Sequence, residues 1–259
     1  MRNTFFNKFE GSIAGIIVTM LLSSTLRAAE EEAAAASGGD SRIDTLADIL
    51  QAGGVPLYFI IILSIATLFL VLFFLFTFRA SVLAPRKFIQ EADEAARDGD
   101  VEAVRSACQS DNSAASSIIN SATEHIETTG HVDYFTVRDA VEDEGSRQAN
   151  TLWQRLQYLM DVAVVAPMVG LLGTVLGMLD SFAGMETELG AVKPVTVSQG
   201  VAKALITTAA GLSVGIAAMI LYALFRGRLN KLITHLEITC NGILRRMVEN
   251  VKKRQESES

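Results

Sequence analysis

The residues that could carry chemistry in this sequence are two threonines inside apolar stretches. Thr174 lies in the run Val162–Phe182, and Thr208 lies in the run Val195–Phe225. At 1.5 Å per residue, Thr174 is roughly 20 Å from the cytoplasmic edge and Thr208 roughly 16 Å from the outer edge, which predicts a matched depth near the middle of a membrane. Each hydroxyl could bond to the carbonyl four residues earlier in its own helix. Alternatively, the two could form a polar patch that another helix or water shares.

Two opposite charges accompany the threonines. Lys203 lies about two turns below the outer end of the third apolar run, and Asp180 lies at a similar depth in the second. Charges in hydrocarbon usually pair or line a cavity, so we expect an Asp180–Lys203 pair that a charge swap would preserve. The alternative is that Lys203 extends to the outer headgroups.

The other reactive residue types form no recognisable site. The glycines from Gly170 to Gly177 lack the lysine of a phosphate loop, and no serine has a triad context. The three histidines, His125, His131 and His235, lack zinc-ligand spacing, and Cys108 and Cys240 are far apart. The net charge of −7 argues against a nucleic-acid partner. We therefore expect no enzyme activity, metal site or cofactor.

The elements that must position these residues are membrane helices, because half of the residues are hydrophobic and long stretches carry no charge. The apolar N-terminus resembles a secretory signal, with an uncleaved anchor as the alternative. Lysine and arginine follow the first and third runs, which predicts an outside N-terminus. The expected organisation is a signal peptide (1–28), a periplasmic linker (29–54), a first span (55–79), a cytoplasmic helical domain (80–160), a second span (161–184), a periplasmic loop (185–196), a third span (197–225) and a cytoplasmic helical tail (226–259).

The cytoplasmic segments read as helices throughout, so the fold class is all-α. We expect one helix to end at Asp98-Gly99, Asp100 to cap the next, and Asp133 to cap a long helix. That long helix should continue through Ala166-Pro167 into the second span, and the tail should continue the third.

Spans two and three each have a small-residue side and a large aliphatic side. The small side of span two contains Ala166, Gly170, Gly173, Thr174, Gly177, Ser181 and Gly184, opposite Met168, Leu171, Val175, Leu179 and Phe182. The small side of span three contains Ala204, Thr208, Gly211, Gly215 and Ala218, opposite Ile206, Ile216, Ile220 and Leu224. Small sides allow helix backbones to approach closely, so Gly170, Gly173, Gly177, Gly211 and Gly215 are the predicted packing residues. The large sides suit lipid.

Two motifs resemble a known family. The run APMVGLLGTVLGM at 166–178 and the run ALITTAAGL at 204–212 are similar to the second- and third-span signatures of the ExbB/TolQ/MotA proton-channel family, closest to ExbB. The resemblance covers about residues 78–249.

The resemblance implies a three-span protein of the bacterial inner membrane that forms a homopentamer. Spans two and three would line its pore, with Thr174 and Thr208 facing inward. The pore would enclose single-span helices of an ExbD- or TolR-like partner that carries a protonatable aspartate. Proton flow would then drive a TonB- or TolA-like protein that reaches the outer membrane.

Two positions depart from the family pattern. Lys203 stands where the best-known members commonly have glutamate, and Ala217 replaces a common proline of span three. An acidic role at position 203 therefore does not transfer. The alternatives to an ExbB-like channel are a TolQ-like subunit of an envelope-integrity system and a membrane scaffold that conducts nothing.

Overall fold

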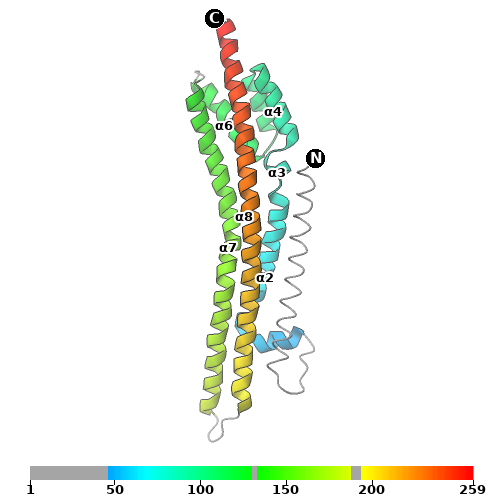
Figure 1. The fold of residues 1–259 in the computed structure, drawn as a ribbon, viewed down its shortest axis with the longest axis vertical. Helices are drawn as coiled ribbons and strands as arrows, with labels where there is room; N and C mark the ends of the chain where they lie inside the picture. The colour runs from blue at the N-terminus through cyan, green and yellow to red at the C-terminus, as the bar shows by residue number, and fades with distance from the viewer. Residues whose placement is uncertain (1–45, 130–132, 188–193, 259) are drawn as a thin grey trace. The chain divides into compact units, whose positions relative to one another are not determined.

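All regular secondary structure in the described residues, 46–129, 133–187 and 194–258, is helical in this computed structural model (Figure 1). The helices of these ranges are α2 (Leu46–Thr77), α3 (Ala80–Leu83), α4 (Arg86–Asp98), α5 (Val101–Gln109), α6 (Ala114–Thr129), α7 (Tyr134–Thr187) and α8 (Pro194–Glu258). Three of them contain stretches long and apolar enough to cross a membrane: Gly54–Thr77 in α2, Tyr134–Ala183 in α7 and Gly200–Arg254 in α8. The predicted all-α fold with three candidate spans is confirmed. The predicted signal peptide lies outside the described residues.

The chain divides into two compact units. The spanning unit consists of the described residues up to Leu72 together with Gln157–Leu224, and the helical unit consists of Phe73–Leu156 and Phe225 onward. Each unit has its own packing, and each is described in turn.

In the spanning unit, α7 and α8 lie side by side (Figure 1). Pro167 is inside α7 without ending it, so the predicted continuous helix is confirmed. A proline inside a helix removes one backbone hydrogen bond and adds ring bulk. Gly215 of α8 makes room for that ring, because a Cβ on Gly215 would lie 2.6 Å from Cγ of Pro167.

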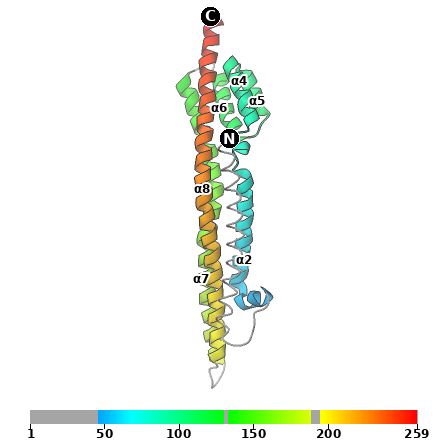
Figure 2. The ribbon, with the colours of Figure 1, turned by 45° about the vertical axis from the view of Figure 1, so that its right-hand side comes forward.

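Helix α2 of the spanning unit has a kink at Gly54, whose φ of 62° and ψ of −163° are not helical. Glycine adopts positive φ without the steric cost that a Cβ brings. Pro56 lies two residues after Gly54, inside the helix, and is buried. Figure 2 shows α2 beside α7 and α8, and the contact falls at Pro56, which lies 3.3 Å from where a Cβ on Gly173 would be.

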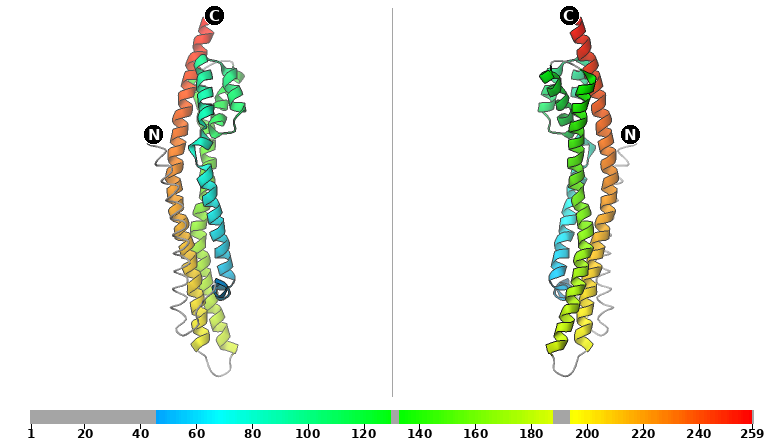
Figure 3. Two further views of the ribbon diagram at one scale, coloured as in Figure 1. Left: turned by 90° about the vertical axis from the view of Figure 1, so that its right-hand side faces the viewer. Right: turned by 90° about the vertical axis from the view of Figure 1, so that its left-hand side faces the viewer.

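In the helical unit, the short helices α4, α5 and α6 pack against the C-terminal part of α8 (Figure 3). Their apolar residues recur at helical spacing, so each has one side that needs cover. The resulting core consists of Phe88, Ala92, Ala96, Val104, Cys108, Ala115, Ile118, Ile119, Ala122, Ile126, Val137, Val141, Leu236, Cys240, Ile243, Leu244, Met247, Val248 and Val251.

The predicted helix boundaries of this unit are confirmed by their caps. The Asp100 carboxylate accepts a hydrogen bond of 3.0 Å from the Ala103 amide at the start of α5. Asp133 accepts one of 3.3 Å from the Thr136 amide at the start of α7. Gly99 ends α4 in the left-handed conformation, with φ of 66°. These are the side-chain and backbone chemistries that helix ends require.

Side chains from the C-terminal turns of α8 donate hydrogen bonds to carbonyls at the end of α4. The sequence alone does not predict this contact. Asn250 Nδ2 donates to the Ala96 carbonyl at 3.2 Å, and an Arg254 guanidinium nitrogen donates to the Gly99 carbonyl at 3.4 Å. These carbonyls belong to the last turn and to the C-cap of α4, where hydrogen-bond partners within the helix become few. One turn of α8 earlier, Arg246 pairs with Asp93 of α4. The C-terminal turns of α8 therefore hold α4 through polar contacts as well as through the apolar core.

We expect Gly99→Ala to destabilise the helical unit by about 1–2 kcal/mol, the typical cost of a left-handed conformation for a residue with a Cβ. The new Cβ would also lie 3.1 Å from backbone atoms of Asn250. The matched control is Gly145→Ala in α7, because that position is helical and its Cβ would meet only Ile118 at 4.0 Å. Urea unfolding followed by Trp153 fluorescence measures both, since the chain has one tryptophan. Equal midpoints for the two variants would contradict the prediction.

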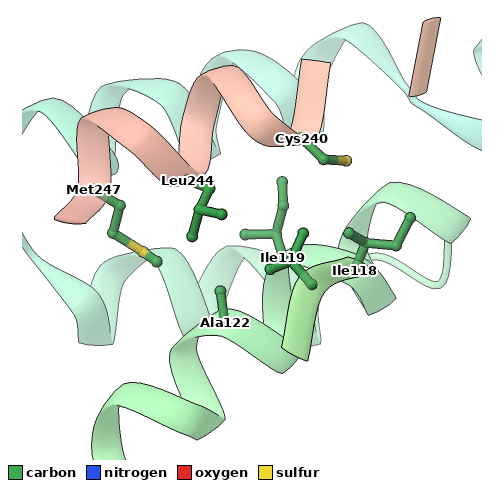
Figure 4. Close-up of a pocket in the computed structure, with 7 residues that line it drawn as sticks. Ile118, Ile119, Ala122, Cys240, Leu244 and Met247 are labelled. Carbon is green, nitrogen blue, oxygen red and sulfur yellow. The ribbon is translucent and has the colours of Figure 1, made fainter. Parts of the chain in front are cut away.

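Both cysteines are free and buried in the core of the helical unit. Cys240 packs there with Ile118, Ile119, Ala122, Val141, Leu244 and Met247, and these side chains leave no space large enough for a water molecule between them (Figure 4). Burial raises the pKa of Cys108 to about 12, with a further contribution from the Asp111 carboxylate. Burial also raises the pKa of Cys240 to about 12, and Cys108 adds to this effect.

These shifts predict thiols that resist modification in the folded protein. The thiolate is the reactive form, and a pKa of about 12 leaves little of it at neutral pH. A raised thiol pKa stabilises the fold fully below the ordinary pKa of 9.0, and this contribution is lost as the pH rises from 9 towards 12. We expect slow reaction with a maleimide at pH 7, fast reaction in urea, and a fall in unfolding free energy above pH 9. Rapid labelling of the folded protein would contradict this.

Candidate functional site

Glycines bring the backbones of α7 and α8 together along the spanning unit. A Cβ on Gly211 would lie 2.6 Å from the Ala166 carbonyl oxygen and 2.9 Å from Cα of Gly170. A Cβ on Gly177 would lie 3.0 Å from Cβ of Ala204. Approach this close needs positions without side chains on both helices. All five glycines singled out from the sequence, Gly170, Gly173, Gly177, Gly211 and Gly215, lie along this contact.

The two threonines lie at the same level of the helix pair. Gly173 is directly opposite Thr207. Thr174 and Thr208 each follow one of these two residues, so they lie at nearly the same height along the helix pair, as the rise per residue predicts. This height is called the threonine level below. Thr208 Oγ1 donates a hydrogen bond of 3.0 Å to the Gly170 carbonyl across the interface. Thr174 Oγ1 donates one of 2.6 Å to the Leu171 carbonyl of its own helix. The bond from Thr208 links the two helices, and the bond from Thr174 is local.

Thr207 is a further residue of this site that the sequence does not single out. It is 1% exposed, and its Oγ1 donates to the Ala204 carbonyl at 2.8 Å. It packs against Gly173, where Pro56 of α2 also arrives. Three helices therefore meet at the threonine level, and this level coincides with the N-terminal end of the apolar stretch of α2. The sequence feature that could have identified Thr207 is its position next to Thr208 in the run ALITTAAGL.

The large aliphatic sides behave as expected with one exception. Met168, Leu171, Val175, Leu179 and Phe182 of α7 and Ile216, Ile220 and Leu224 of α8 are all exposed. Ile206 was predicted to share this exposed side, but it is 4% exposed, so that prediction is wrong. The small-residue side of α8 meets α7, and α2 arrives beside the neighbouring Thr207. At Thr207, therefore, α8 is in contact with α7 and lies close to α2.

The predicted Asp180–Lys203 pair remains a prediction. Asp180 is exposed on α7, whereas the side chain of Lys203 lies outside what the structure describes, as do the surroundings of Gly184. Near these residues, Ser181 donates to the Gly177 carbonyl at 2.9 Å and packs on Gly200 of α8.

The described residues of the spanning unit include few charged side chains. Its described side chains carry two charges, Asp161 and Asp180, both exposed on α7. Asp180 is six residues beyond Thr174, about 9 Å along the helix. The described residues contain no cluster of three potential metal ligands. Among the described residues, the side chains at the threonine level thus offer hydroxyls and no charge.

These features define a class of protein: a multi-span helical membrane protein with a close-packed, hydroxyl-bearing pair of helices. A family model described as the MotA/TolQ/ExbB proton channel family matches residues 87–238. The chain belongs to this family.

Known relatives share parts of this chain. The Tol-Pal system protein TolQ of Pseudomonas aeruginosa is 43% identical over 88 residues, which are 34% of this chain and 38% of that protein. The biopolymer transport protein exbB1 of Vibrio cholerae is 39% identical over 64 residues, 25% of this chain and 28% of that protein. A putative ExbB homologue of Methanothermobacter thermautotrophicus is 32% identical over 142 residues, 55% of this chain and 48% of that protein. The matches thus span less than half of each relative.

Proposed function

We propose that this chain is the proton-channel subunit of a bacterial inner-membrane motor, and that Thr174 and Thr208 line its ion path. One observation carries this proposal: two half-buried hydroxyls lie at one level of a glycine-packed helix pair. Membership of the proton channel family supports it. The glycines hold the hydroxyls in place, and the large aliphatic sides face outward.

In this proposal the titrating group lies on another protein, and the described side chains at the threonine level carry no carboxylate. We propose that an ExbD- or TolR-like single-span protein supplies it and that five copies of this chain enclose that partner. Moving one charge across 100 mV yields about 2.3 kcal/mol, enough to bias a rotation step. A TonB- or TolA-like protein would transmit the motion to the outer membrane.

The topology of this proposal follows the sequence. The N-terminus lies outside after signal cleavage, residues 80–160 and the tail lie in the cytoplasm, and the protein crosses the inner membrane three times. Relatives are named both ExbB and TolQ, so a TolQ-like role in envelope integrity is the second candidate. The partner that copurifies with the chain discriminates the two.

The test is proton flux through the assembled complex in liposomes, measured with an internal pH dye. Thr174→Val and Thr208→Val keep the side-chain shape and remove the hydroxyl. We expect each to lower the flux by roughly tenfold, because losing a hydrogen bond of ~1–2 kcal/mol at the barrier changes a rate by about that factor.

Two controls separate conduction from folding. Thr174→Ser and Thr208→Ser retain the hydroxyl and should retain flux. Thr239→Val removes a hydroxyl of the helical unit that bonds to the His235 carbonyl, and it should leave the flux unchanged. Size-exclusion chromatography verifies assembly. Normal flux in intact complexes of both valine variants would contradict the role of the two threonines, whereas a wild-type complex without proton flux would favour the non-conducting scaffold.

A further inference from the structure

Basic side chains of the helical unit lie in the three segments that adjoin the apolar runs. Residues 73–90, 145–156 and 225–236 contain no aspartate or glutamate, whereas residues 91–144 of the same unit contain fourteen, with only three arginines. Because the chain has a net charge of −7, this segregation does not follow from its overall composition. The lysines and arginines of the three segments, called the basic band below, are Arg79, Arg86, Lys87, Arg147, Arg155, Arg226, Arg228 and Lys231.

Two arginines of the basic band follow a shared cluster of phenylalanine rings. The ring of Phe78 stacks on that of Phe74 with centroids 5.0 Å apart, and the ring of Phe225 lies 5.7 Å from Phe74 and 6.3 Å from Phe78. All three rings are buried. Arg79 follows Phe78 and Arg226 follows Phe225, so the cluster brings the end of α2 and the start of the basic part of α8 to one level. Both arginines are exposed there.

The Arg79 side chain turns back onto the last turn of α2. Its Nε donates a hydrogen bond of 3.2 Å to the Leu75 carbonyl, and its guanidinium carbon lies 5.4 Å from the centroid of the Phe76 ring. A guanidinium over an aromatic ring is held by cation–π attraction. Phe76 is 65% exposed and belongs to the apolar stretch Gly54–Thr77, so its ring faces lipid in a membrane. The charge of Arg79 is therefore held beside the lipid-facing surface, where that surface ends.

Both guanidinium groups keep hydrogen-bond donors for a ligand. A guanidinium has five N–H donors, and Arg79 uses the one on Nε for Leu75. Within the part of the chain that the structure describes, neither Arg79 nor Arg226 forms an ion pair with an acidic side chain. Paired guanidinium donors match the oxygens of a phosphate group, which they bind in a bidentate manner.

We propose that Arg79 and Arg226 bind the phosphate of an anionic phospholipid, whose acyl chains lie along the exposed ring of Phe76. A zwitterionic lipid also has a phosphate, but its ammonium group would lie among the other lysines and arginines of the basic band, with no carboxylate of these segments to pair with it. An anionic headgroup has no such conflict. Anionic lipids are abundant in the cytoplasmic leaflet, where the proposed topology places the basic band. Proton conduction is not needed for this binding.

The acidic segment has the opposite relation to such a lipid. The fourteen carboxylates of residues 91–144 are repelled by an anionic membrane surface, whereas the basic band is attracted to it. Lipid binding at Arg79 and Arg226 therefore holds the membrane-proximal end of the helical unit at the headgroups and keeps α4, α5 and α6 away from them.

Native mass spectrometry of the full-length protein, released from a neutral detergent, tests the proposal. The probes are phosphatidylglycerol and phosphatidylcholine with identical acyl chains, so that only the headgroup differs. We expect the wild-type protein to bind phosphatidylglycerol more tightly. Arg79→Gln with Arg226→Gln should weaken this binding by roughly 25-fold, about fivefold for each basic residue removed near the headgroups. It should leave phosphatidylcholine binding nearly unchanged.

A matched control removes the same charge elsewhere. Arg97→Gln with Arg138→Gln neutralises two exposed arginines of the acidic segment and should leave the preference for phosphatidylglycerol intact. Arg79→Lys keeps the charge but loses the paired donors, so its affinity should lie between those of the wild type and Arg79→Gln. Size-exclusion chromatography and circular dichroism verify that each variant is assembled and folded.

Four outcomes would overturn the proposal. The first is unchanged phosphatidylglycerol binding in a folded Arg79→Gln, Arg226→Gln protein. The second is equal weakening by the control pair, which would indicate an effect of net charge alone. The third is displacement of the lipid by an equal concentration of inorganic phosphate, which would assign the arginines to free phosphate. The fourth is binding of polyglutamate without any preference between the two lipids, which would assign the basic band to an acidic protein segment.

Discussion

Gly211→Ala should separate α7 from α8 and lower the melting temperature of the purified protein by several degrees. Its Cβ would lie 2.6 Å from the Ala166 carbonyl oxygen and 2.9 Å from Cα of Gly170, both backbone atoms that no side-chain rotation can move. Overpacking of this kind typically costs about 1–3 kcal/mol. The gain in helix propensity from glycine to alanine, about 1 kcal/mol, offsets only part of that cost.

The separation should also affect conduction, because the hydrogen bond from Thr208 to Gly170 spans the same interface. Gly170→Ala should be milder, as its Cβ would meet the nearest atom of α8 at 3.1 Å. The matched control is Gly227→Ala on α8, where a Cβ meets nothing within 4 Å. Thermal unfolding in detergent, followed by circular dichroism, measures all three. A Gly211→Ala protein as stable as the Gly227→Ala protein would contradict the close approach described above.

Met247→Ala should destabilise the helical unit by about 2–5 kcal/mol, the range for truncating a buried methionine. Met247 is 0% exposed and packs with Ile119, Ala122 and Leu244 (Figure 4). Truncation therefore leaves a new cavity inside the core of the helical unit, because the surrounding helices can relax into it only in part.

The control for Met247→Ala is Ile238→Ala on the same helix, since Ile238 is 67% exposed. Surface substitutions usually change stability by no more than about 0.5 kcal/mol. Urea unfolding followed by Trp153 fluorescence compares the two. Similar midpoints for both variants would show that the C-terminal part of α8 is not packed into this core.

The features that sequence predicted correctly depend on local chemistry. The caps at Asp100 and Asp133 and the left-handed Gly99 follow from residues within three positions of each helix end. The continuity of α7 through Pro167 follows because no turn signal interrupts the apolar pattern. The glycines of α7 and α8 were identifiable because a stripe of small residues has one common use in membranes.

The features that sequence missed depend on a third partner. Ile206 lies opposite the small-residue side of α8. A helical wheel that assumes a single packing partner on the small-residue side therefore predicts that Ile206 faces lipid. Ile206 is nevertheless buried, and its neighbour Thr207 packs against Gly173 where Pro56 of α2 also arrives. The sequence pattern of α8 does not predict this contact with a third helix. Likewise, Asn250 and Arg254 look like ordinary tail residues until the end of α4 is placed beside them.

The contact between Pro56 and Gly173 has a consequence for the lipid bilayer. The apolar stretch of α2 begins at Gly54, yet α7 continues for fourteen residues past Gly173 to Thr187, about 21 Å by the helix rise. The exposed side chains of Leu179 and Phe182 extend the apolar surface of α7 well past the start of the apolar stretch of α2. A lipid layer in contact with both helices would therefore meet apolar surfaces of different heights, a hydrophobic mismatch. We therefore expect the stability of this protein in liposomes to depend on the acyl-chain length of the lipid.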